Sequence, residues 1–221
     1  MASPQAQRSR RTPANNRATA VHLRLRSKII SGHFPQGSAL AEPVLAEHFQ
    51  TSRAPIREAL VALEREGLVT FEKTGRTRVR TIGAKDFREI MEARAALESM
   101  AAGLANRNWA EGDTEFVTKN IEEQTKARSL AELSRLDIDL HHFVVTSSGN
   151  LRLLQLWEPL RWQWEAHLVE IYRRQKNDDF IPEKETIKAH KHLLEALANG
   201  TPSEASQSMM NHILFNLRWA K

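Results

Sequence analysis

The chain has 221 residues, of which 41% are hydrophobic and 27% charged, and this is enough for one large or two modest folded domains. It contains no cysteine, which excludes disulfide frameworks, iron–sulfur clusters and thiolate zinc sites. No apolar run approaches the roughly 20 residues that span a bilayer, and no apolar core follows the N-terminal arginines, as it would in a signal peptide. We therefore expect a cytoplasmic protein without a membrane partner.

The formal net charge of +5 is unevenly distributed along the chain. Residues 1–81 hold 14 Lys or Arg against 6 Asp or Glu, whereas residues 82–221 hold 18 against 21. A basic first third joined to a mildly acidic remainder is typical of a module that binds a polyanion and is fused to something else. A solvated basic face would give the same balance, so charge alone does not choose between the two.

Two segments precede the first recognisable motif. Residues 1–16 lack apolar periodicity and are rich in Ser, Pro, Asn and Arg, so we expect a disordered tail with a basic character. Residues 17–31 have apolar positions at helical spacing, and Gly32 is expected to end this helix.

Residues 42–81 predict two helices joined by a tight turn and followed by a hairpin. The expected elements are a short helix at 42–49, a helix at 52–66, and strands at 68–72 and 77–81. Ser52 is a candidate N-cap, because its hydroxyl can accept from an unpaired first-turn N–H. This is the pattern of a winged helix-turn-helix.

From residue 84 to the end the pattern is helical. The expected helices are 84–108, 112–127, 130–147, 150–176, 183–199 and 203–219. Short connections predict an antiparallel bundle. The predicted fold is therefore mainly α, with a winged helix-turn-helix domain at 17–81 followed by a bundle of about six helices at 84–219.

The second helix of the pair has the features of a DNA-reading helix. Its buried stripe is expected at Ile56, Leu60 and Leu63. Arg53 and Arg57 lie beside this stripe near the helix N-terminus, the end that faces base edges in the major groove, and arginine pairs well with guanine O6 and N7. Alternatively, Arg57 pairs with a local carboxylate such as Glu58 or Glu64. The complete motif around the helix favours DNA.

Further side chains of the motif are candidates for DNA contact. The hairpin carries basic residues that strand alternation partly places on one face, and hydroxyls at the turn suit phosphate. These candidates are Glu42, Thr51, Ser52, Lys73, Arg76, Arg78 and Arg80.

The segment from Gly32 to Val69 resembles the signature of the GntR superfamily of bacterial transcription regulators. The matching stretches are GHFPQG, Leu40, Glu42, Leu45-Ala46 and the run from Ser52 to Val69. Gln36 is an insertion relative to the signature, and Gln50 stands where a turn glycine is usual. The resemblance implies a homodimer, a palindromic double-stranded operator, and a response to a small molecule.

The remainder resembles the FadR-type branch with its FCD effector domain. The resemblance rests on FREIMEARAALESMAAGLA (87–105), LDIDLHHFVVTSSGN (136–150) and IKAHKHLLEALANGTPSEA (187–205). Leu140 stands where an aromatic residue is common in the family.

Four residues of the helical domain are candidate metal ligands. Asp137 and His141 are four residues apart on one predicted helix and so project together. His190 and His212 lie on the inner faces of their helices. One carboxylate and three imidazoles form a divalent site, and the FCD resemblance implies this ligand set for zinc, nickel or manganese. Taken singly, each would more often be a hydrogen-bonded core residue.

An anionic effector, expected to be a carboxylate, needs a cation nearby. Arg94, at the matching position of the opening FCD-like helix, and Arg161, among several tryptophans, are the candidates.

Two other readings remain open at this point. In the first, the chain is an enzyme that uses the metal for hydrolysis and has a vestigial helix-turn-helix. In the second, the four candidate ligands only brace a metal-free bundle. Asp137 has no second carboxylate base on its helix face, because Asp139 points away. We therefore expect a regulator and not an enzyme, acting as a repressor or an activator.

Overall fold

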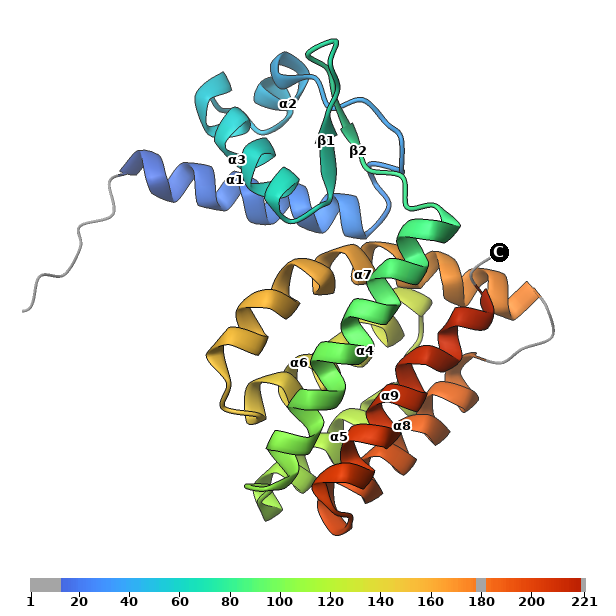
Figure 1. Cartoon of the computed structure of the whole chain (residues 1–221). Helices are drawn as coiled ribbons and strands as arrows, with labels where there is room; N and C mark the ends of the chain where they lie inside the picture. The colour runs from blue at the N-terminus through green and yellow to red at the C-terminus, as the bar shows by residue number, and fades with distance from the viewer. Residues whose placement is uncertain (1–12, 178–181, 220–221) are drawn as a thin grey trace, which may run out of the picture. The chain divides into compact units, whose positions relative to one another are not determined.

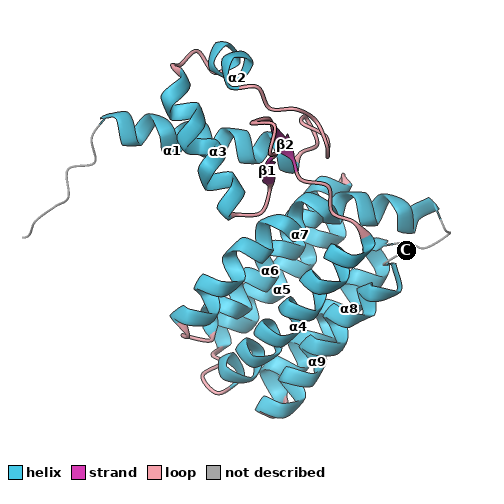
Figure 2. Ribbon diagram, turned by 45° about the horizontal axis from the view of Figure 1, so that its top comes forward, coloured by secondary structure: helices cyan, strands magenta, loops and turns pink. Residues whose placement is uncertain are grey.

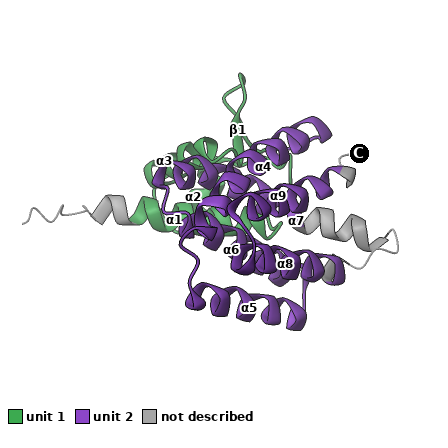
Figure 3. Ribbon diagram, turned by 60° about the horizontal axis from the view of Figure 1, so that its bottom comes forward, with its two compact units in different colours: residues 1–80 green, residues 81–221 purple. Residues whose placement is uncertain are grey.

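The computed structural model describes residues 13–177 and 182–219. The chain divides into two compact units, residues 1–80 and residues 81–221 (Figure 3). We describe each unit by itself. The predicted fold class is confirmed, because a winged helix-turn-helix is followed by a helical bundle.

The described residues of unit 1, 13–80, form three helices and a two-stranded antiparallel sheet (Figure 1). Its elements are α1 (Pro13–Ile30), α2 (Glu42–His48), α3 (Arg53–Arg65), β1 (Val69–Phe71) and β2 (Thr77–Val79). The two strands pair with Val69 opposite Val79 and Phe71 opposite Thr77.

The core of unit 1 forms where α3 packs against α1 and α2. The predicted stripe is confirmed, because Ile56, Leu60 and Leu63 are completely buried. Leu25 of α1 is also fully buried. Burying each such side chain contributes roughly 1.5–3 kcal/mol, so this stripe fixes which face of α3 points outward.

Two expectations for unit 1 are wrong in detail. The first helix begins at Pro13, so residues 13–16 are not part of a disordered tail, and proline is well tolerated in a first helical turn; residues 1–12 lie outside the described part of the chain. Ser52 does occupy the N-cap position of α3, but its hydroxyl makes no capping hydrogen bond.

Unit 2 consists of helices packed around one main core (Figure 2). The helices are α4 (Ala84–Asn106), α5 (Glu111–Lys126), α6 (Leu130–Ser147), α7 (Leu151–Asn177), α8 (Pro182–Asn199), α9 (Pro202–Leu214) and the 3-10 helix η1 (Phe215–Trp219). Most predicted boundaries agree within two residues. The sequence predicts that the last helix ends at residue 219, but it ends at Leu214, because the chain tightens into η1.

Polar caps position the helices that matter for the site. The Ser129 hydroxyl accepts from the Glu132 N–H at the start of α6. At the start of α9, the Thr201 N–H donates to Glu204 and the Glu204 N–H donates to the Thr201 hydroxyl. This reciprocal capping box satisfies two otherwise unpaired donors. None of the described helices is long and apolar enough to cross a membrane.

The turn between α2 and α3 contains a strained residue. Gln50 has φ of 51°, and among the described residues it is the one non-glycine residue with positive φ. This left-handed conformation costs an ordinary L-residue roughly 1–2 kcal/mol.

Replacing Gln50 with glycine should therefore stabilise the protein. Relief of the strain exceeds the roughly 0.5–1 kcal/mol of extra unfolded-state entropy that glycine brings, so we expect a gain of about 0.5–1 kcal/mol in denaturant titration of the full chain. Gly75→Ala is the matched control, because Gly75 has φ of 78° and open space where a Cβ would lie. It should lower stability by about 1 kcal/mol. A Gln50→Gly protein less stable than wild type would contradict the strain.

Candidate metal centre and DNA-reading helix

One carboxylate and three imidazoles come together inside unit 2. Asp137 and His141 lie one turn apart on α6, His190 is on α8, and His212 is on α9. One ligand atom from each of the four residues lies within 4.8 Å of all the others. The sequence therefore identified a group of side chains that the fold brings together, and this group could hold a metal ion.

Three of the four residues are buried, and His212 is half-buried. Asp137 is 4% exposed, His141 1% and His190 0%. Burying ionisable groups is unfavourable unless they are paired or coordinate a metal, so this arrangement requires compensation from within the site.

Contacts inside the cluster leave one buried nitrogen without a partner. His190 Nε2 lies 3.3 Å from Asp137 Oδ1, yet this buried nitrogen has no hydrogen-bond partner of good geometry. His141 Nε2 lies 3.0 Å from His212 Nε2. A divalent cation among these atoms would satisfy all of them as ligands, so the residues present fit a metal.

The protonation states favoured by the site also suit a metal. Burial lowers the pKa of His190 and holds the pKa of His212 well below its usual value. Burial alone would raise the pKa of Asp137, but the interaction with His190 and the neighbouring imidazoles brings it well below the ordinary value. Metal ligands must be deprotonated carboxylates and neutral imidazoles, and these are the forms that the fold favours.

A second buried carboxylate contacts the cluster and was missed by the sequence analysis. Glu98 of α4 is 0% exposed. Its Oε1 accepts from Arg94 Nε at 2.7 Å and from Trp157 Nε1 at 2.7 Å, and its Oε2 contacts His141 Nδ1. Burial alone would raise the pKa of Glu98, but the charge of Arg94 and its contact with His141 lower it to about 2. An oppositely charged pair four residues apart on an alanine-rich buried face was the available signal.

His190 has an outer partner of its own. Its Nδ1 lies 2.8 Å from Gln124 Oε1. Gln124 Nε2 donates to Asn120 Oδ1 at 2.7 Å, and Asn120 Nδ2 donates to the Leu136 carbonyl at 3.1 Å. These amides on α5 thus tie one imidazole of the cluster to the backbone of α6.

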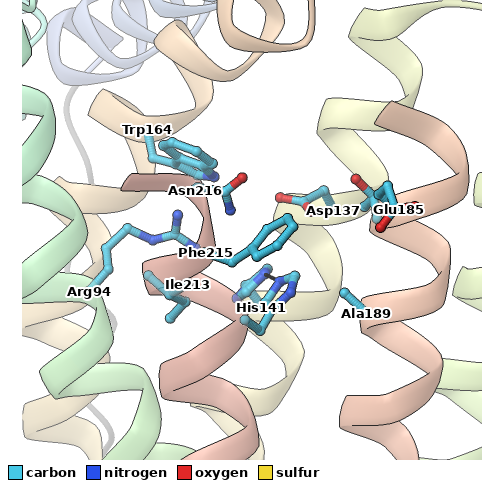
Figure 4. Close-up of a pocket in the computed structure, with 11 residues that line it drawn as sticks. Arg94, Asp137, His141, Trp164, Glu185, Ala189, Ile213, Phe215 and Asn216 are labelled. Carbon is cyan, nitrogen blue, oxygen red and sulfur yellow. Dashed lines mark hydrogen bonds between the residues drawn. The ribbon is translucent and has the colours of Figure 1, made fainter. Parts of the chain in front are cut away.

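A pocket opens beside the cluster (Figure 4). Asp137, His141 and His212 line it, together with Arg94 and Trp164. The Arg94 guanidinium carbon lies 4.6 Å from the centre of the Trp164 ring. The pocket therefore places a buried guanidinium next to the candidate metal ligands.

The second effector candidate is elsewhere. Arg161 is not among the residues that line this pocket. Its guanidinium lies 3.7 Å from Asp139 and 3.8 Å from Glu158, and it stacks over Trp162. The structure thus places Arg161 beside these carboxylates and this ring and outside the lining of this pocket, and its role as an effector contact stays a prediction.

His142 and His192, which lie close in sequence to His141 and His190, stay outside the cluster. His142 lies 3.4 Å from Glu158, and His192 is exposed on α8. Asn150 caps α7, because its Oδ1 accepts from the N–H groups of Arg152 and Leu153. None of the three belongs to the four-residue group.

In unit 1, two of the three arginines of α3, Arg53 and Arg57, lie near its N-terminal end. Arg53 and Arg57 are exposed, and Arg57 forms a two-pronged ion pair with Glu42 of α2. Nε donates to Oε1 at 2.9 Å and Nη2 donates to Oε2 at 3.0 Å. Arg57 thus has a carboxylate partner, although this is Glu42 rather than the predicted alternatives Glu58 and Glu64.

The basic side chains of the hairpin differ in their surroundings. Lys73 and Arg76 are exposed. Arg78 is half-buried, donating to Glu72 at 2.8 Å and to the Gly37 carbonyl at 2.9 Å. Arg78 thus braces the hairpin, and Lys73 and Arg76 are the more accessible cations. Ser52 is exposed and Thr51 half-buried at the turn before α3.

Comparison with known proteins identifies both units. The family model for bacterial regulatory proteins of the gntR family matches residues 17–79, and the FCD domain model matches residues 89–215. A probable D-xylose utilization operon transcriptional repressor of Paenarthrobacter nicotinovorans is 28% identical over 93% of this chain and 89% of its own length. A gluconate operon transcriptional repressor of Bacillus licheniformis is 30% identical over 72% of this chain and 68% of its own length.

Solved structures share the fold. A putative GntR regulator from Rhodococcus sp. RHA1 aligns with a TM-score of 0.77 at 21% identity, covering 93% of this chain and 97% of that one. McbR/YncC of E. coli aligns with a TM-score of 0.78 at 21% identity, covering 92% and 96%. The relatives are regulators and not enzymes. The chain belongs to the GntR family and is a DNA-binding transcription regulator with an FCD domain.

Proposed function

We propose that the protein is a homodimeric repressor that binds a palindromic operator through unit 1 and a divalent metal with a small carboxylate through unit 2. The observation that carries the effector half is the position of Arg94 in the same pocket as Asp137, His141 and His212. The DNA-binding domain would be residues 17–81, preceded by a basic tail, and the effector domain residues 84–219.

Asp137, His141, His190 and His212 would hold the metal. Imidazole and carboxylate ligands suit zinc, nickel or manganese. With six-coordinate metals, four protein ligands leave positions open, and there the metal would supply a Lewis-acidic contact for a carboxylate.

Arg94 would bind the other side of the same carboxylate. A guanidinium offers a planar pair of donors that matches a carboxylate, and burial strengthens this contact because water does not compete. One relative is named as the repressor of a gluconate operon, and gluconate is itself a carboxylate. This name supports the chemical class of effector, and the repressor names of the relatives support repression.

Operator recognition would start from the two exposed arginines near the N-terminus of α3. Arg53 and Arg57 would face base edges, while the turn and hairpin residues would contact phosphates. Those supporting contacts would come from Thr51, Ser52, Lys73, Arg76 and Arg78. Glu42 would act through Arg57: its carboxylate occupies the Nε–Nη2 side of the guanidinium, leaving the Nη1–Nη2 end for guanine O6 and N7.

Dimerisation is required for useful affinity. One α3 covers only a few base pairs, and two copies of a helix-turn-helix bind half-sites of a palindrome. In unit 2, exposed apolar side chains include Met100 of α4 and Leu151 and Leu156 of α7, which supports contact with a second copy through these helices.

Arg53→Ala and Arg57→Ala should each weaken binding to the preferred sequence by about 1–3 kcal/mol. The preferred sequence is first selected from random duplexes with the wild-type protein, and affinities are then measured by fluorescence anisotropy at two salt concentrations. Arg65→Ala is the matched control, because Arg65 is exposed in the last turn of the same helix. If the Arg53 and Arg57 variants both bind the selected duplex as tightly as the Arg65 variant, these two arginines do not read the operator.

A His190→Ala, His212→Ala double variant should lose the bound metal, because it removes half of the proposed ligands. Metal content is measured by mass spectrometry after loading with zinc, nickel or manganese and gel filtration. A His142→Ala, His192→Ala variant has the same number of imidazoles removed outside the cluster and should keep its metal. Full retention in the first variant would reject the site.

The metal-free protein should lose stability as the pH falls below about 6.5. The pKa values of His190 and His212 are lowered from 6.5 in the fold, so the unfolded chain binds protons first and folding stability is fully present only above pH 6.5. Melting temperatures of chelator-treated protein between pH 8 and 5 test this. The double variant at these two positions should show a flatter profile; an equally steep one would contradict the assignment.

A further inference from the structure

Glu98 is the one described carboxylate that contacts both a candidate metal ligand and the guanidinium of the pocket. Its two oxygens have separate tasks. Oε1 accepts from Arg94 Nε and Trp157 Nε1, at 2.7 Å each, and Oε2 faces His141 Nδ1. Because the buried Glu98 carboxyl forms an ion pair with the Arg94 guanidinium, it is ionised and has no proton to donate. His141 must therefore carry its proton on Nδ1, which leaves the lone pair on Nε2.

The amides beside His190 impose the same tautomer by a different route. The Leu136 carbonyl can only accept, so Asn120 must present its NH₂ to it and its Oδ1 to Gln124. Gln124 must then present its NH₂ to Asn120 and its Oε1 to His190 Nδ1. Turning either amide over would set two acceptors or two donors against each other. His190 therefore also carries its proton on Nδ1.

Both imidazoles consequently direct an Nε2 lone pair into the cluster. His190 Nε2 is the buried nitrogen without a hydrogen-bond partner, and His141 Nε2 is the atom 3.0 Å from His212 Nε2. Two unrelated outer contacts, from α4 and from α5, give one result. Neither Glu98 nor Gln124 is a ligand in the four-residue group.

We propose that Glu98 and the Gln124–Asn120 pair are positioning residues that set the tautomers of His141 and His190, so that both bind the metal through Nε2. The proposal rests on the metal centre of the proposed function. Because Glu98 also accepts a hydrogen bond from Arg94, it fixes the positions of His141 and of the Arg94 guanidinium relative to each other. Outer partners of this kind change metal affinity by roughly 10–100-fold when they are replaced.

Glu98→Gln is a sharp test, because the variant keeps every hydrogen bond of the metal-free core but reverses the tautomer of His141. The amide oxygen would accept from Arg94 and Trp157, and its NH₂ would donate to His141 Nδ1. His141 would then carry its proton on Nε2, the atom that must bind the metal. We expect this variant to fold and to lose roughly 10–100-fold in zinc affinity.

Gln124→Met provides a second, independent variant. It keeps the length of the side chain and removes the acceptor for His190 Nδ1. We expect the zinc affinity to fall by roughly 10-fold, at the lower end of the same range, because a neutral acceptor is lost. Glu195→Gln is the control for Glu98→Gln. It makes the same change from Glu to Gln on an exposed face of α8 and should leave zinc affinity unchanged.

The experiment has two readouts on the full-length protein. The first is nitrogen NMR of the metal-free protein at pH 8, which reports the tautomer of each imidazole; His141 and His190 signals are assigned from their loss in His141→Asn and His190→Asn. The second is zinc affinity by competition with a chromophoric chelator. Melting temperatures identify any variant that is simply unfolded.

The expected result is an Nδ1–H tautomer for both histidines in the wild type, Nε2–H for His141 in Glu98→Gln, and the zinc affinities given above. A wild-type Nε2–H tautomer at His141, or a folded Glu98→Gln protein with wild-type zinc affinity, would overturn the proposal. If the wild type bound no zinc, nickel or manganese, the proposed metal function would fail, and the NMR result would still decide the tautomers.

Discussion

The helical domain depends on how it accommodates hydrogen-bond acceptors in its core. Asp137, Glu98, His141 and His190 are buried, and His212 beside them is half-buried. Leaving one buried polar group unsatisfied costs about 1–3 kcal/mol, so a core with several of them needs either donors or a cation. Arg94 and Trp157 supply donors to Glu98. At the other end of the network, His190 Nε2 faces Asp137 Oδ1 and has no hydrogen-bond partner. A cation is the group that suits these two atoms.

This constraint explains why the domain uses so many helices around one site. A single helix can place two ligands one turn apart, as α6 does with Asp137 and His141. The remaining imidazoles come from α8 and α9, and their outer partners come from α4 and α5. Since a metal would bridge α6, α8 and α9, its binding free energy would add to the stability of the folded domain. A ligand that changed the coordination would thereby act on the packing of these helices.

The sequence predicted which four side chains come together better than it predicted their surroundings. Asp137 and His141 were accessible because a four-residue spacing on a helix fixes their mutual position, and the family resemblance added His190 and His212. Glu98 and Gln124 were not found, because their role depends on the approach of α4 and α5 to α6 and α8, which periodicity does not encode. The same holds for the surroundings of Arg161, one turn from Trp164 on α7, because its partners Asp139 and Glu158 are set by tertiary packing.

The same distinction applies to the DNA-reading unit. The stripe on α3 follows from local periodicity, and Arg53 and Arg57, which flank Ile56, are exposed. The partner of Arg57 does not follow, because Glu42 is 15 residues away on another helix. An exposed ion pair of this kind contributes little to stability. Its consequence is geometric: a guanidinium held on one side has fewer orientations to lose when its free end meets a base, and this lowers the entropic cost of recognition. In both units, therefore, a carboxylate orients a side chain that we propose to bind a partner: Glu42 orients Arg57, and Glu98 orients His141.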